Sequence, residues 1–214
     1  MKNRNSVLDD AQRSWVRNWW RALQPPDEKW EPLPPALRGL DRGERAALRR
    51  AADGDALLME SSTHLLARGL VTLDAKRDWP QLRNETEAYL AIALVAGVLA
   101  GVRDDASDDL SLAHRLGHAS GNRPRMSELR FKRLLKASDE TDLLRQWRRA
   151  VDLADRKADV ARLADDLLGW QIEQARPQAS ASRSVRFRWA YDYYLTTRQQ
   201  NAGEEPESIK EITE

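Results

Sequence analysis

The longest apolar run of the chain, AYLAIALVAGVLAGV at residues 88–102, constrains the fold most strongly. A helix needs roughly 20 consecutive apolar residues to cross the hydrocarbon core of a bilayer, and this run is a turn or two shorter. It carries no charged residue, so a helix built from it has no face suited to water. The run therefore predicts a helix buried inside a globular protein, and no membrane partner.

Helical periodicity dominates the rest of the chain, and runs of alternating β-branched residues are missing. The segment PPDEKWEPLPP at 25–35 is predicted to be an irregular connection, because proline lacks a backbone donor and restricts the residue before it. The pattern predicts an all-α fold of about eight to nine helices. The predicted helices cover residues 7–23, 41–52, 55–67, 81–103, 108–118, 127–137, 139–155, 159–174 and 184–199.

Two small packed helical bundles are expected, with the acidic stretch DDASDD at 104–109 at their boundary. The first bundle covers 1–103 and the second 104–200. From residue 201 the chain is acidic and has no aromatic residue, which predicts a disordered acidic tail over 201–214.

Composition narrows the class of protein. The 214 residues are 41% hydrophobic and 32% charged, which is typical of a globular protein that buries a core. The absence of cysteine excludes a disulfide framework and a thiolate zinc site, and it fits a reducing compartment. The first residues, MKNRNSVLDDAQ, lack the apolar segment of a signal peptide. We therefore expect a cytoplasmic location.

Positive charge is concentrated although the net charge is only +1. Between Arg123 and Lys136 there are six basic residues, Arg125 among them, against one glutamate. On a helical wheel, the helix at 127–137 separates a cationic arc from an apolar arc. The cationic arc is Lys132, Arg133 and Lys136 with Arg130 at its flank, and the apolar arc is Phe131, Leu134 and Leu135.

The next helix repeats this division. Either Ser138 or Asp139 is expected to cap it. Its predicted buried stripe is Leu143, Leu144, Trp147, Ala150 and Val151. Arg145, Arg148 and Arg149 are predicted to point away from that stripe, with only Asp152 to offset them. The short linker predicts that the two helices pack as a hairpin, so that their basic faces join.

Basic outer faces of helices are commonly just solvated, and that interpretation is open for each face taken alone. Like charges at helical spacing cost a few tenths of a kcal/mol per pair, however, so two adjacent uncompensated faces indicate an anionic partner. A row of cations suits a phosphate backbone. The segment RGERAALRRA at 42–51, which contains Arg49 and Arg50, extends the row.

The segment RSVRFRWAYDYY at 183–194 interleaves arginines with aromatic rings, as base-stacking surfaces do. Phe187, Tyr191 and Tyr194 fall at i, i+4 and i+7 of one helix, so we expect most of these rings to lie in the core.

Candidate catalytic groups are sparse. His114 and His118 have the i, i+4 spacing of two metal ligands, but no glutamate follows the first and no third ligand is evident nearby. Packing or surface histidines are the preferred interpretation, and a metal-dependent hydrolase is a third hypothesis. The aspartate pairs at 104–105, 108–109 and 165–166 are interpreted as linker charge and a solvated helix face. We expect no catalytic residue, no metal and no cofactor.

Three segments together resemble the CasB family, the small subunit of Cascade, which is the type I-E CRISPR surveillance complex. They are LSLAHRLGHASGNRPRMSELRFKRLLKASDETDLLRQWRRAVDLADR, ADVARLADDLLGW and VRFRWAYDYY. The similarity covers roughly residues 107–194 well and the N-terminal half more loosely. The signature consists of helices and includes no catalytic motif.

The resemblance implies a non-catalytic helical protein, present in two copies in the complex. Its implied partners are the backbone and large subunits, the guide RNA and the displaced strand of target DNA. The family's basic positions match Arg49, Arg50, Arg130, Lys136, Arg148 and Arg149. With the cations found from the helical pattern, the expected nucleic-acid-binding residues are Arg49, Arg50, Arg123, Arg125, Arg130, Lys132, Arg133, Lys136, Arg145, Arg148 and Arg149.

The leading hypothesis is therefore a non-catalytic nucleic-acid-binding subunit that holds the displaced strand and stabilises the R-loop in antiviral defence. The alternative is a helical adaptor whose basic faces dock onto acidic protein partners. The Pro-rich connection at 25–35 and the acidic tail depart from the family pattern.

Overall fold

The structure is a computed structural model that describes residues 6–73, 85–121, 123–175 and 181–203. These residues form ten helices and only two short strands, which confirms the predicted all-α class. The helices are α1 Asp10–Ala22, α2 Arg42–Arg50, α3 Gly54–Leu58, α4 Ser61–Leu73, α5 Glu85–Leu99, α6 Leu112–Gly117, α7 Glu128–Lys136, α8 Glu140–Leu153, α9 Val160–Ala175 and α10 Val185–Gly203, with 3-10 turns η1 Pro35–Leu37 and η2 Ala181–Arg183.

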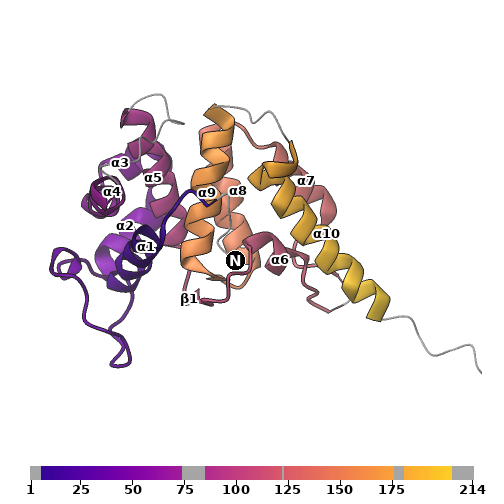
Figure 1. The fold of residues 1–214 in the computed structure, drawn as a ribbon, viewed down its shortest axis with the longest axis horizontal. Helices are drawn as coiled ribbons and strands as arrows, with labels where there is room; N and C mark the ends of the chain where they lie inside the picture. The colour runs from indigo at the N-terminus through magenta and orange to yellow at the C-terminus, as the bar shows by residue number, and fades with distance from the viewer. Residues whose placement is uncertain (1–5, 74–84, 122, 176–180, 204–214) are drawn as a thin grey trace, which may run out of the picture.

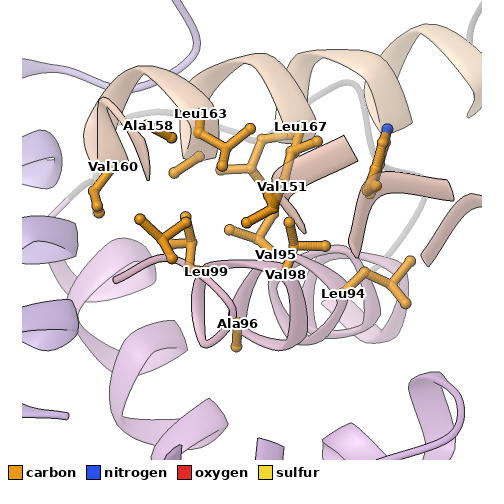
Figure 2. Packing of buried hydrophobic residues seen from close by; sticks show 14 of the residues in the cluster. Leu94, Val95, Ala96, Val98, Leu99, Val151, Ala158, Val160, Leu163 and Leu167 are labelled. Atoms are coloured by element: carbon orange, nitrogen blue, oxygen red, sulfur yellow. The ribbon is translucent and has the colours of Figure 1, made fainter. Parts of the chain in front are cut away.

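Helix α5 lies at the centre of the fold, as its apolar sequence predicts. Every residue from 91 to 100 is buried, and α5 packs against α3, α4, α8 and α9. In Figure 2, Val95, Val98 and Leu99 of α5 lie against apolar side chains of α8 and α9. The helix has no polar face, so burial on all sides is its stable arrangement.

Helices from both sides of residue 103 pack together. Both α1 and α5 contact α9, and α5 also contacts α8 (Figure 1). The division into bundles at 1–103 and 104–200 stays a prediction. Helix α10 continues to Gly203, three residues into the predicted tail, and 204–214 lie outside the described residues.

The acidic stretch at 104–109 is fixed to the start of α9, whereas the sequence predicted loose linker charge. Strand β1 (Asp104–Asp105) pairs in parallel with β2 (Lys157–Ala158). The Asp105 carboxylate accepts a hydrogen bond from the Val160 backbone N–H at 3.0 Å. Two-residue strands carry no sequence periodicity, so the pairing has no signal in the pattern.

Asp165 is buried, which corrects its predicted place on a solvated helix face. One of its oxygens accepts hydrogen bonds from the backbone N–H groups of Val7 and Leu8 at 2.8 and 2.7 Å and from the Ser6 hydroxyl at 2.9 Å. Its other oxygen lies 3.4 Å from the Arg13 guanidinium. One carboxylate of α9 thus holds the segment that leads into α1.

Asp166 is also buried, and it joins α9 to α10. It accepts a hydrogen bond from the indole N–H of Trp189 at 2.9 Å. Two guanidinium groups, of Arg162 and Arg188, lie 3.3 and 3.4 Å from it. Burial raises the pKa of this carboxyl, and the two arginines oppose the shift. Buried carboxylates are tolerated only with such partners.

Arg148 fastens α8 to the end of α2. Its guanidinium donates hydrogen bonds to three backbone carbonyls: Ala51 at 2.7 Å, Leu48 at 2.8 Å and Gly97 at 3.2 Å. Two of these carbonyls lie at the C-terminus of α2, where a cation complements the helix dipole. Burial lowers the pKa of Arg148, and the positive charge of Arg49 adds to the shift.

Replacing Asp165 with alanine removes the acceptor of three hydrogen bonds and leaves Arg13 without its buried partner. We expect Asp165→Ala to lower the free energy of unfolding by about 3 kcal/mol. Asp152→Ala is the matched control, because its ion pair with Arg156 is largely exposed and contributes less than about 1 kcal/mol. Urea denaturation of the two variants measures the difference. Equal losses would contradict the anchoring role of Asp165.

The neighbouring arginines Arg148 and Arg149 provide a second matched pair. Arg148→Ala leaves three carbonyls unpaired and is expected to cost about 2 kcal/mol or more of unfolding free energy. The Arg149 side chain is exposed and donates no hydrogen bond to any described residue, so Arg149→Ala should stay within about 0.5 kcal/mol of wild type. Thermal or urea unfolding compares them, and equal stability of both variants would refute the fastening role.

Candidate nucleic-acid interface

Helix α7 is anchored by aromatic side chains from α10. The Phe131 ring stacks on Tyr193 with ring centroids 4.0 Å apart. The Tyr193 hydroxyl donates a hydrogen bond to the Met126 carbonyl at 2.7 Å, just before α7 begins. Burial raises the pKa of Tyr193 to about 12. These contacts turn the apolar face of α7 inward and set its basic face toward solvent.

The cations predicted on the outer face of α7 are all exposed: Arg130, Lys132, Arg133 and Lys136. Lys132 forms an ion pair with Glu128 at 2.6 Å. This pair holds the pKa of Glu128 below, and that of Lys132 above, the ordinary value. The other three cations make no ion pair with any described residue.

On α8 the structure changes the predicted charge balance. Asp139, and not Ser138, caps the helix by accepting from the Asp142 N–H at 2.9 Å. Arg145 is exposed and pairs with Asp142, whose pKa it lowers, and Arg133 of α7 adds to that shift. The basic face of α7 therefore adjoins the first turn of α8.

The predicted exposed position of Arg148 is wrong, because its guanidinium is half-buried and bonded to the carbonyls described above. Asp152, predicted to offset the arginines of this helix, instead pairs with Arg156 at 2.7 Å. Arg149 remains exposed without an ion pair in the described residues.

The remaining predicted residues lie on α2 and on the turn before α7. Arg49 and Arg50 are exposed in the last turn of α2, which Arg148 holds against α8. Arg123 is exposed, and Arg125 pairs with Asp155 beyond the end of α8.

We call the exposed predicted residues that make no ion pair within the described chain the open cations. They are Arg49, Arg50, Arg123, Arg130, Arg133, Lys136 and Arg149.

Most aromatic rings of α10 lie in or against the core, as predicted, because Trp189 and Tyr193 are buried and Tyr194 packs partly buried against it, but the predicted stripe is wrong for two rings. Phe187 and Tyr191 are exposed, whereas Trp189 and Tyr193 are buried. The buried stripe of α10 is Val185, Trp189, Tyr193 and Thr196. Trp189 and Tyr193 have the same i, i+4 spacing as the exposed rings. Helical spacing alone therefore does not decide which of the two pairs faces the core.

His114 is half-buried and His118 is exposed, with ring centroids 6.0 Å apart. Burial lowers the pKa of His114, and the neighbouring His118 adds to the shift. Across the described ranges, no three histidine or acidic side chains gather so as to hold a metal ion. Nor does any described helix combine the length and apolarity required to cross a membrane.

Comparisons with known proteins give a matching family profile, a similar protein and a similar solved structure. The sequence profile described as CRISPR-associated protein Cse2 matches residues 44–194. The CRISPR-associated protein Cse2 of Thermus thermophilus is 36% identical over 123 residues, which are 56% of this chain and 62% of the relative. The crystal structure of CasB from Thermus thermophilus is 26% identical, with a TM-score of 0.49 over 86% of this chain and 96% of that one.

The profile match spans more than half of the chain, and it includes most of α2 and all of α7 and α8, with all seven open cations. The predicted resemblance is thereby confirmed, and the chain belongs to the Cse2 family, the CasB family of type I-E CRISPR systems.

Proposed function

We propose that this protein is the non-catalytic small subunit of a type I-E Cascade complex in the cytoplasm, and that it binds single-stranded nucleic acid. In this role it contacts the backbone and large subunits, the guide RNA and a second copy of itself. It holds the displaced DNA strand and so stabilises the R-loop. The observation that carries the proposal is the group of open cations, in a chain of the Cse2 family.

Charge balance favours an anionic partner for these cations. Elsewhere in the described chain, half-buried arginines commonly pair with aspartates, as Arg115 does with Asp108 and Arg156 with Asp152. Exposed arginines that make no ion pair among the described residues, such as Arg38 and Arg68, lie singly on different elements. On the outer face of α7, three of four cations have no such pair. Arginine also binds phosphate with a planar, bidentate fork, and 28 of the 35 basic residues are arginine.

A weak and sequence-independent site is sufficient for the proposed role. Exchanging a DNA duplex for an RNA–DNA hybrid is nearly balanced in free energy, so phosphate contacts to the expelled strand shift the equilibrium toward the open loop. Because these contacts release counterions, binding should weaken steeply with salt. Arg148 is left out of the proposed contacts, since its donors already bond to backbone carbonyls.

Neutralising two open cations of α7 tests the proposal. We expect Arg133→Gln/Lys136→Gln to bind a labelled single strand more weakly than wild type at low salt. Each phosphate contact contributes about 0.7 to the slope of log affinity against log salt, so the slope should become shallower by about 1.4. Fluorescence anisotropy at several salt concentrations measures both effects.

Arg38→Gln/Arg68→Gln is the charge-matched control. Both residues are exposed and are not among the open cations: Arg38 follows η1, and Arg68 belongs to α4, which lies at the end of the molecule opposite to α7 (Figure 1). The control should bind as wild type does. Equal weakening by both pairs would point to a general charge effect and contradict the site. If wild type ignores nucleic acid but binds an acidic protein of the complex through α7, the adaptor hypothesis replaces the proposal.

A further inference from the structure

Two aromatic rings of α10 project from the surface at one side of the helix. Phe187 is 48% exposed and Tyr191 is 58% exposed, and Leu195, one turn further, is 42% exposed. Neither ring packs against another aromatic ring in the described part of the chain. The core contacts of α10 come instead from Trp189 and Tyr193 on the opposite side. The exposed rings are therefore not required to hold α10 in place.

The spacing of the two rings suits successive contacts along a strand. They are four residues apart, which corresponds to about 6 Å along the helix axis. Stacked bases in a nucleic-acid strand are separated by about 3.4 Å, so two steps cover nearly the same distance. A strand extended to about twice that rise thus presents adjacent bases, with their faces uncovered, at the spacing of the two rings.

The charges of α10 around the rings favour an anionic ligand. From Val185 to Gln199 the only carboxylate is Asp192, and it accepts a hydrogen bond from the Ser111 hydroxyl at 2.6 Å. No other acidic side chain of α10 borders the rings within these residues. Arg198 is exposed seven residues after Tyr191, on the same side of the helix.

Helix α7 packs beside this part of α10. The Tyr194 hydroxyl, three residues after Tyr191, lies 3.3 Å from the Glu128 carboxylate, which in turn pairs with Lys132. The Tyr194 ring also meets Phe131 edge-on, with centroids 6.2 Å apart. Through these contacts, the part of α10 that carries Tyr194 lies against the Glu128–Lys132 edge of α7, so the exposed rings and the basic helix belong to neighbouring elements.

We propose that Phe187 and Tyr191 form a base-stacking platform for single-stranded nucleic acid, alongside the phosphate-binding cations of α7. The inference rests on the proposed function and adds the part of the ligand that α10 recognises. Every base presents a π-face, so such a platform binds strands without sequence preference. An acidic protein segment would also match the cations and can pack on exposed rings, so an assembly assay is needed to distinguish that partner.

The test replaces the rings while keeping the surface apolar. Phe187→Leu/Tyr191→Leu removes both π-faces, and Phe187→Tyr/Tyr191→Phe is the matched control that retains them. Each protein is titrated, as the full chain, into labelled oligothymidine and into an abasic phosphodiester of the same length. The four substitutions of these two variants all lie on the exposed side of α10. The circular dichroism spectrum and the thermal unfolding curve of each variant should therefore match those of wild type.

Wild type and the ring-retaining control should prefer oligothymidine. The leucine variant should bind oligothymidine about tenfold more weakly or worse, and the abasic strand as tightly as wild type does, with an unchanged salt slope. A leucine variant with wild-type affinity for oligothymidine would overturn the platform. In that case the proposed function would stand if Arg133→Gln/Lys136→Gln bound the strand more weakly than wild type. Wild type that binds neither strand would overturn both proposals.

A separate readout covers a protein partner. If the leucine variant binds oligothymidine normally but fails to assemble with the other subunits, the rings contact protein, and the platform is overturned. Strands carrying iododeoxyuridine give a positional check, because photocrosslinks mapped by mass spectrometry should fall on Phe187 or Tyr191. Crosslinks confined to residues of other helices would count against the inference.

Discussion

The burial of α5 is the constraint on which the rest of the structure depends. Because this helix offers no polar face, its surface must be covered on all sides, and helices from distant parts of the chain supply the cover. Helix α9 is the most important of these, since it also contacts α1 and α10. The orientation of the outer helices, and hence of their basic faces, follows from how they pack around this pair.

Buried charge makes that packing specific. Apolar contacts alone allow helices to slide and rotate at modest cost, whereas a buried carboxylate must meet its donors. Asp165 fixes the start of α1, and Asp166 fixes Trp189 of α10, both from adjacent positions on α9. Arg148 has the corresponding role for α2. In each case a side chain that resembles surface charge in the sequence serves as a connection between helices.

The same principle separates the structural arginines from the open cations. An arginine whose donors meet carbonyls or carboxylates of the fold has little left to offer a ligand, and Arg148 and Arg162 are of this kind. Arg130, Arg133 and Lys136 lack such partners in the described chain and project from one face of α7. This face of α7 lies within the part of the chain that matches the Cse2 profile.

The sequence by itself determined the helical class, the buried position of α5, the approximate extent of most helices and the apolar and basic arcs of α7. These properties depend on local periodicity and composition, which act within a few turns of one helix. Tertiary structure alone decided that Asp165, Asp166 and Arg148 turn inward, that 104–105 pairs with 157–158, and that Trp189 rather than Phe187 enters the core. Each of these outcomes depends on a partner far away in the sequence. A single helix with polar and aromatic residues on several faces does not specify which face its neighbours will cover.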